Sequence, residues 1–169
     1  PTHSQDMKQV CKTNENTVRE FLSLIRFGLW GNTVPAAGQA MQTSVARNPG
    51  NDNSRLDWKG ILFLARKQAL LPLLYDGMEY LPEDKRLQGP ALMQLIAYVD
   101  KVENHNRALD EAAVEISSRL AAEGIRSVLL KGQGNAVLYR NPLHRQCGDI
   151  DLYVGAANYE KAVGIIRGW

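Results

Sequence analysis

Two acidic residues inside a short apolar run are the part of this sequence best suited to chemistry. Asp149 and Asp151 alternate with apolar residues in the stretch GDIDLYV. Side chains alternate along a strand, so both aspartates and Tyr153 are expected on one face. The opposite, core-facing side would carry Ile150, Leu152 and Val154. The two carboxylates would then project together, about 6–7 Å apart, a separation set by two residues of strand rise.

This pair of carboxylates predicts a cation site. Two like charges at about 6 Å repel each other by roughly 1–3 kcal/mol, depending on solvent exposure. A cation between them removes that repulsion, and Mg²⁺ is a hard ion that prefers oxygen ligands. Aspartates at the end of a strand also serve simply to cap a turn, so the interpretation depends on what else the sequence provides.

A glycine-punctuated turn lies upstream, in the stretch LLKGQGNA. The predicted strand ends at Lys131 and is followed by Gly132 and Gln133 just before a helical segment. Backbone amides at such a turn, together with a helix N-terminus, can hold phosphate oxygens. Lys131 adds a point charge suited to phosphate, although a solvated lysine at a strand end is an equally simple interpretation.

Arg145 lies four residues before Asp149 and can add a bidentate phosphate contact. The alternative is that Arg145 pairs with Asp149 or Asp151 when no metal is bound. A phosphate-binding turn and a metal-binding carboxylate pair on neighbouring strands are the components that nucleotidyl transfer requires.

The stretch GIRSVLLKGQGNAVLYRNPLHRQCGDIDLYV resembles the uncharacterised nucleotidyltransferase family, a bacterial branch of the polymerase-beta-like nucleotidyltransferase superfamily. The resemblance implies an enzyme that uses Mg²⁺ of the two-metal type and an NTP, and that moves an NMP to the hydroxyl of a small molecule or a protein. It implies that Asp149 and Asp151 bind the metal. The residues that it implies for nucleotide binding are Lys131, Gly132, Gln133 and Arg145.

Two features differ from that superfamily. Its turn is generally Gly-Ser or Gly-Gly, whereas this chain has Lys131, Gly132 and Gln133. Its enzymes use a third carboxylate on a later strand, and this sequence stops at Trp169 before such a strand. We therefore expect a fragment that is inactive by itself. The alternatives are a non-catalytic interaction protein that keeps the fold, and an antitoxin-like enzyme that nucleotidylates a partner protein.

Helices are expected to occupy the first two thirds of the chain. The first is predicted over residues 17–30, between an Asn16 cap and a stop at Gly31. Its apolar stripe would be Val18, Phe21, Leu22, Ile25 and Leu29. Residues 31–55 read as a long connection with a short helix around 39–45. The aromatic residues expected in the helical core are Trp30, Trp58 and Phe63.

A second helix is predicted to begin after an Asp57 cap and to restart at Pro72. A very long one follows from Pro90 to about Glu123 and stops at Gly124. It would extend roughly 50 Å, so we expect a kink near His105 or a long hairpin partner.

After Gly124 the pattern becomes strand, helix, strand, helix, with the first of these helices in QGNAVLYR. The expected fold is thus a mostly helical α+β fold, in which a helical N-terminal region precedes the start of a nucleotidyltransferase-type mixed sheet flanked by helices. The expected divisions are a loose leader over 1–15, a helical region over 16–123 and an α/β part over 124–169.

Composition excludes several classes. The 20 basic and 18 acidic residues largely interleave, so there is no strong nucleic-acid signal. Cys11 and Cys147 lie far apart and outside any metal-binding spacing, which favours a reducing cytoplasm. No secretory signal or membrane span is recognisable. His144 is predicted to be an exposed loop residue, as are His3 and His105.

Overall fold

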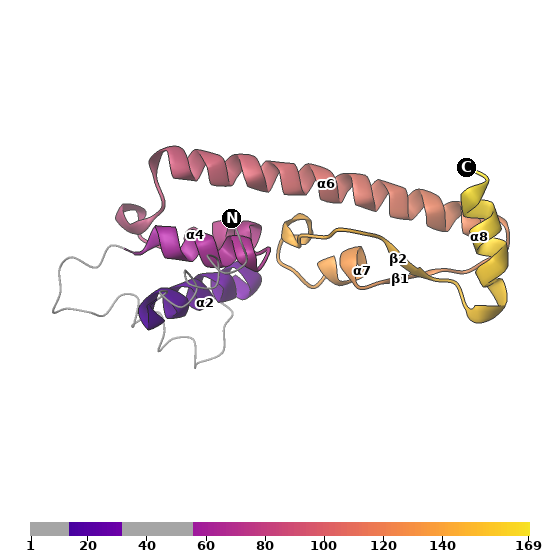
Figure 1. The fold of residues 1–169 in the computed structure, drawn as a ribbon, viewed down its shortest axis with the longest axis horizontal. Helices are drawn as coiled ribbons and strands as arrows, with labels where there is room; N and C mark the ends of the chain where they lie inside the picture. Colours follow the sequence, from indigo (N-terminus) through magenta and orange to yellow (C-terminus); the bar gives the residue numbers. More distant parts are fainter. Residues whose placement is uncertain (1–13, 32–55) are drawn as a thin grey trace, which may run out of the picture. The chain divides into compact units, whose positions relative to one another are not determined.

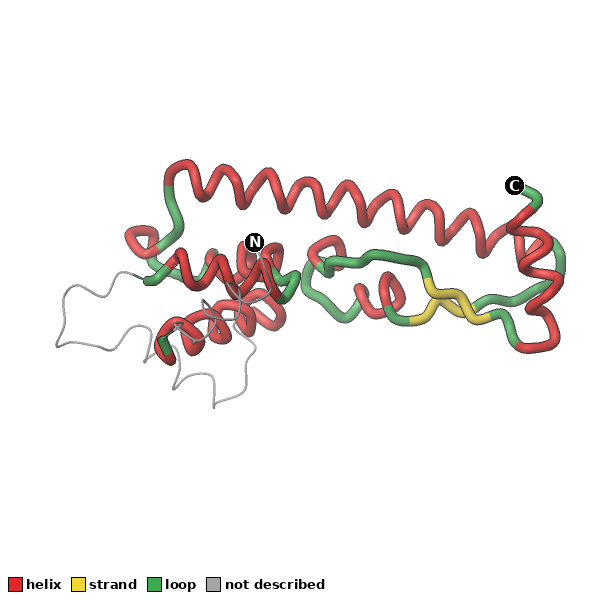
Figure 2. Tube along the Cα trace, viewed as in Figure 1, coloured by secondary structure: helices red, strands yellow, loops and turns green. Residues whose placement is uncertain are grey.

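A computed structural model of the protein describes residues 14–31 and 56–169. Its elements, shown in Figures 1 and 2, are α2 (Glu15–Trp30), α4 (Trp58–Lys67), α5 (Leu71–Met78), α6 (Gly89–Ala122), β1 (Val128–Leu130), α7 (Gly132–Ala136), β2 (Asp151–Tyr153) and α8 (Tyr159–Arg167), with short 3-10 helices η3 (Glu83–Lys85), η4 (Pro142–His144) and η5 (Ala156–Asn158). The fold is mostly helical with a two-stranded antiparallel sheet, which confirms the predicted fold class.

The chain forms two compact units, Pro1–Tyr98 and Val99–Trp169. The division predicted from the sequence lies before residue 124, where the pattern changes from helix to strand. The structure has that change between Ala122 and Val128. Most of the predicted leader, the predicted short helix at 39–45, His3 and Cys11 lie outside the described residues.

In the first unit, α2 packs closely on α5 through two glycines. A Cβ atom built on Gly28 would lie 2.1 Å from the carbonyl oxygen of Leu73, and one built on Gly77 would lie 1.9 Å from that of Leu24. Neither position has room for a side chain. The two backbones therefore approach each other more closely than any larger residue would allow.

The face that α2 buries differs from the apolar stripe that was predicted for it. Phe21 and Ile25 are buried as expected, but Val18 and Leu22 are exposed and Leu24 takes their place in the core. The core prediction for Trp30 is wrong, since 54% of that residue is exposed. Trp58 and Phe63 are partly buried.

The predicted helix ends in this unit are largely correct. The Asp57 side chain caps α4 by accepting from the Gly60 backbone N–H, and Pro72 stands in the first turn of α5. The cap of α2 is Asn14 and not Asn16, while Gly31 ends the helix as expected.

Helix α6 runs from Gly89 to Ala122 without interruption, including the region near His105, where a kink or a long hairpin partner was expected. Few apolar residues lie on this part of the helix, but polar side chains make contacts there. Asn106 is fully buried and donates hydrogen bonds to the carbonyl oxygens of Leu143 in η4 and of Arg145 just after it. Buried polar contacts replace the missing apolar ones. Across the described residues, no helix is long and apolar enough to cross a membrane.

In the second unit, β1 and β2 pair antiparallel, with Val128 opposite Tyr153, Leu129 opposite Leu152 and Leu130 opposite Asp151. One face of this sheet packs against the ends of α6 and α8. The core there consists of Leu120, Ile125 and Ala162, with Ile116, Leu152, Val154 and Ile165 packed on it. Helix α7 is short and ends at Ala136, earlier than the pattern predicted.

Candidate functional site

The antiparallel register brings the glycine turn and the carboxylate pair together. Leu130, the last residue of β1, lies opposite Asp151, the first residue of β2. The next residue along, Lys131, places its Nζ 3.2 Å from Oδ2 of Asp151. The two motifs, twenty residues apart in sequence, therefore share one end of the sheet.

Gly132 and Gly134 let the backbone of the turn approach its neighbours. A Cβ atom on Gly132 would lie 3.2 Å from the carbonyl oxygen of Asp149, which is tighter than ordinary contact. One on Gly134 would lie 2.8 Å from the carbonyl oxygen of Leu129. Glycine at these two positions keeps the turn folded against both the strand before it and the segment that carries the aspartates.

Lys131 itself has an unusual backbone, with φ at 48° and ψ at −130°. A positive φ is uncommon for a residue with a Cβ atom and costs about 1–3 kcal/mol. The lysine side chain is 76% exposed, so solvent screens its ion pair with Asp151 and the pair adds little stability. Lys131 thus combines a strained backbone with an ammonium group that is only weakly held by Asp151.

The predicted strand is shorter than expected. β2 begins at Asp151, and Asp149 lies in the preceding loop, where it is exposed. The apolar face is confirmed for Leu152 and Val154, which pack on the core. Tyr153 is 58% exposed and shares the outer face with Asp151. Whether the two carboxylates share that face stays a prediction.

Gln133 and Arg145 are placed differently from Lys131. The Gln133 side chain is buried, and its amide donates to Oδ1 of Asp110 on α6 at 2.6 Å. The Arg145 guanidinium donates to Sγ of the buried Cys147 at 2.8 Å. These contacts direct neither side chain at Asp149 or Asp151.

His144 is buried, with 4% of the residue exposed, so the prediction of an exposed loop histidine is wrong. Its Nε2 lies 2.9 Å from Oε1 of Glu103 on α6. The hydrogen bond from His144 holds the pKa of Glu103 below its usual value of 4.5, with further lowering by Arg107 against the opposing effect of burial. His105, by contrast, is exposed as predicted.

The polar contacts that α6 makes with Gln133 and with the residues around η4 were not predicted from the sequence. The signal in the sequence was the thin apolar side of the long helix around Asn104–Asn106, for which we expected a kink or a long hairpin partner. Buried amides at such a position are recognisable only once their partners, far away in sequence, are known.

The two aspartates do not belong to a larger cluster of potential metal ligands in the described part of the chain. Within residues 14–31 and 56–169, no three His, Cys, Asp or Glu side chains gather so that they could hold a metal ion.

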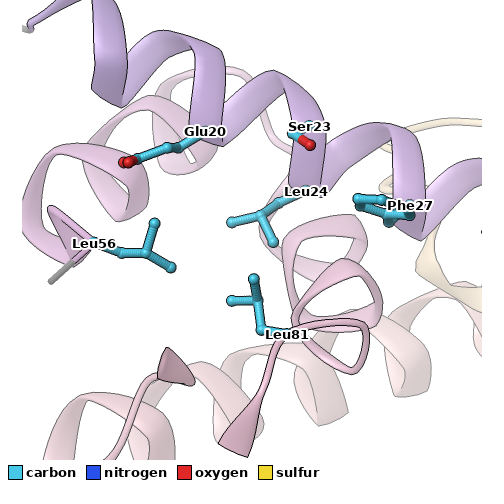
Figure 3. A pocket seen from close by; sticks show the side chains of 6 residues that line it. All are labelled: Glu20, Ser23, Leu24, Phe27, Leu56 and Leu81. Carbon is cyan, nitrogen blue, oxygen red and sulfur yellow. The ribbon is translucent and has the colours of Figure 1, made fainter. Parts of the chain in front are cut away.

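A small hollow in the first unit is the other candidate location. Figure 3 shows its walls, and the described residues that line it are Glu20, Ser23, Leu24, Phe27, Leu56 and Leu81. Burial, and then the nearby Asp57 carboxylate, raise the pKa of Glu20, and Lys85 opposes this. A mostly apolar lining whose one charged group is an acid does not suit a triphosphate.

Comparison with known proteins identifies a family whose model covers both motifs. The family model described as uncharacterised nucleotidyltransferase matches residues 54–168, which include both motifs and most of the described chain. No curated protein and no solved structure matches the chain. The chain belongs to the uncharacterised nucleotidyltransferase family.

Proposed function

We propose that this chain carries the nucleotide-binding end of a Mg²⁺-dependent nucleotidyltransferase, which moves an NMP from an NTP to an acceptor hydroxyl. The observation that carries the proposal is the meeting of Lys131 with Asp151, 3.2 Å apart at the end of the sheet. Family membership adds the reaction class. The acceptor, a small molecule or a protein, is left open by both.

The residues present fit a magnesium ion. Asp149 is exposed and Asp151 is partly so, which leaves carboxylate oxygens accessible. A cationic group already lies against Asp151, namely the Lys131 ammonium. Hard oxygen donors beside a position that attracts positive charge suit Mg²⁺. Asp149 and Asp151 would hold it, and when bound it would supply charge neutralisation for the phosphates and the leaving pyrophosphate.

Lys131 has two possible partners in this scheme. Its Nζ lies 3.2 Å from Oδ2 of Asp151, and this ion pair is weak because solvent reaches both side chains. With nucleotide bound, the ammonium is free to turn to a phosphate oxygen, a charge-assisted contact of greater strength. Lys131 then holds a phosphate while both aspartates are left for the cation.

The turn and Arg145 have supporting roles. Close packing at Gly132 and Gly134 leaves the turn backbone next to Asp149, where its N–H groups can meet phosphate oxygens. Gln133 would contribute through its backbone only, because its side chain is buried against α6. For Arg145 to reach a phosphate, its guanidinium must leave Cys147.

The experiment measures NTP binding and transfer with each of the four NTPs, with and without Mg²⁺. Asp149→Asn and Asp151→Asn should each lower the transfer rate by about 100-fold or more, because a metal ion supplies several kcal/mol of charge stabilisation. Lys131→Met should weaken NTP binding by about 10-fold, the loss of one charge-assisted contact.

The matched control is Asp84→Asn, which changes an exposed aspartate on η3 in the first unit and should leave binding and transfer unchanged. Mass spectrometry of mixtures with candidate acceptors would detect the added nucleotide. If the wild-type protein binds no NTP in the presence of Mg²⁺, or if Asp149→Asn and Asp151→Asn bind and react like wild type, the proposal is wrong.

A further inference from the structure

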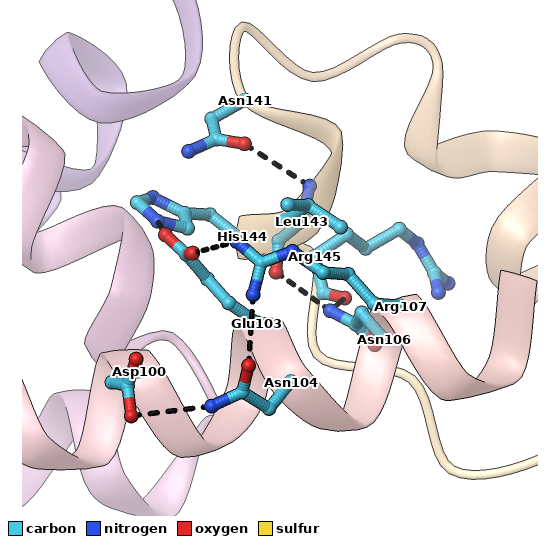
Figure 4. Close-up of polar contacts among 9 residues, drawn as sticks. All are labelled: Asp100, Glu103, Asn104, Asn106, Arg107, Asn141, Leu143, His144 and Arg145. Carbon is cyan, nitrogen blue, oxygen red and sulfur yellow. Dashed lines mark hydrogen bonds and ion pairs between the residues drawn. The ribbon is translucent and has the colours of Figure 1, made fainter.

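One face of α6 carries three polar residues that contact two segments of the candidate site. These segments are the turn over residues 131–135 and the chain over residues 143–151. Glu103, Asn106 and Asp110 are spaced three and four residues apart, which places them on the same side of a helix. Figure 4 shows the first two beside the loop around η4. Each forms a hydrogen bond with a residue more than twenty positions away in sequence.

Asn106 holds the loop that leads to the aspartates. It is fully buried, and its Nδ2 donates to the carbonyl oxygens of Leu143 at 2.6 Å and Arg145 at 2.8 Å. Both N–H groups of this amide are therefore used. The second contact lies four residues before Asp149, so it fixes the chain shortly before the carboxylate pair.

Gln133 holds the turn that follows β1 to the same helix. Its buried Nε2 donates to Oδ1 of Asp110 at 2.6 Å and to the backbone oxygen of Asn106 at 3.2 Å. Gln133 is two residues beyond Lys131. Asn106 thus contacts both site segments, one through its side chain and the other through its carbonyl group.

These contacts are more specific than packing requires. The amide oxygens Oδ1 of Asn106 and Oε1 of Gln133 are buried and have no hydrogen-bond partner among the described residues. An unpartnered buried amide oxygen lowers stability, and a leucine or methionine of similar size would avoid that loss. What an apolar residue would not provide is a directional bond that fixes the position of each segment.

We propose that Asn106 and Gln133 are positioning residues, which set the placement of the Lys131 turn relative to the Asp149–Asp151 segment by holding both to one face of α6. The inference rests on the proposed nucleotidyltransferase function for its catalytic consequence. Its structural part, that these two side chains restrict the two segments, can be tested independently of any activity.

The variants are Asn106→Leu and Gln133→Met, which keep side-chain volume and remove the donors. Matched controls are Asn104→Leu and Gln94→Met, exposed positions on the same helix. Amide hydrogen exchange is followed by mass spectrometry in the intact chain. We expect Asn106→Leu to speed exchange in residues 146–152, and Gln133→Met to speed it in 131–135, by about 10-fold or more. The controls should leave both segments unchanged.

The second measurement is kinetic. Misplaced reacting groups lower kcat by about 10- to 100-fold, whereas KM should change less, because Lys131 and the aspartates remain present. Gln133→Glu, which replaces the donor with a carboxylate facing Asp110, should lower kcat at least as much as Gln133→Met, because the two like charges repel each other. A general loss of stability would instead lower the active fraction and leave kcat per folded molecule unchanged.

The outcomes separate the two proposals. If wild type shows no Mg²⁺-dependent NTP binding, the proposed function fails, and exchange confined to the two segments still supports the positioning role. Unchanged exchange in both segments, or faster exchange spread evenly over residues 99–169, overturns that role. So does an unfolded product from both variants, which would make Asn106 and Gln133 general fold residues.

Discussion

At the scale of single residues, the pair of buried His144 and partly exposed Glu103 determines how part of the stability depends on pH. The folded-state pKa of Glu103 is lowered, chiefly by the hydrogen bond from His144. A carboxyl with a lowered pKa contributes stability that is present above its unfolded value, here about 4.5, and that is lost as the pH falls through the folded value. The contribution is therefore expected to be complete at neutral pH.

We predict that Glu103→Gln lowers the free energy of unfolding at pH 7 by about 1–3 kcal/mol, the loss of a hydrogen bond to a charged group. The difference from wild type should shrink as the pH falls below 4.5. Urea unfolding at a series of pH values measures it. Glu111→Gln, an exposed position on the same helix, is the control. Identical pH profiles for the two variants would contradict the assignment.

Residue-level patterns identified two of the residues that meet at the end of the sheet, but not how the segments around them are held. Asp149, Asp151 and Lys131 were identified by type and spacing, and the structure brings Lys131 to Asp151. The burial of Gln133 and His144 was not predictable, because it depends on partners 23 and 41 residues away on α6. A short-range pattern contains no information about such contacts.

At the scale of elements, the crossing of α2 and α5 depends on glycine. Gly77→Ala would place a methyl group against the backbone of Leu24, and backbone cannot move aside as a flexible side chain can. We predict a loss of about 3 kcal/mol, at the upper end of what overpacking costs. Thermal or urea unfolding would measure it.

Gly164→Ala is the control for that substitution. Gly164 lies within α8, and a Cβ atom there would meet nothing within 4 Å. Alanine is a better helix former than glycine, so this variant should gain about 0.5–1 kcal/mol. Equal effects of the two substitutions would show that close packing at Gly77 is unimportant.

Predictions of where helices begin and end succeeded better than predictions of which face a helix buries. Helix ends at Asp57, Pro72 and Gly124 follow from local rules of capping and backbone conformation, and the structure has them. The face that α2 buries follows from how closely α5 approaches, so hydrophobic spacing assigned Val18 and Leu22 to the wrong side. Local signals fix where a helix stops, whereas tertiary packing decides which side it buries.

At the scale of the whole molecule, the residues matched by the family model do not include every helix that packs in the first unit. The match begins at residue 54, so it omits α2. Yet α2 supplies Leu24 and Gly28, which form the close contact with α5 inside the matched region. The first unit therefore depends on a helix beyond the part that defines the family.

The backbone of Lys131 links the stability of the whole chain to its proposed activity. Glycine adopts its positive φ readily, so Lys131→Gly should release strain of about 1–3 kcal/mol, less about 0.5–1 kcal/mol for glycine's greater freedom when unfolded. We predict a higher Tm together with weaker NTP binding. Lys101→Gly, in the interior of α6, should lower Tm without affecting binding. A lower Tm for Lys131→Gly would refute this.

Such a result would make Lys131 a case of the trade-off between stability and function. A sequence optimised for thermal resistance alone would have glycine after β1, whereas this one has a charged side chain in a conformation that disfavours it. Engineering the protein toward a higher melting temperature would therefore tend to remove the very cation that the proposed reaction needs.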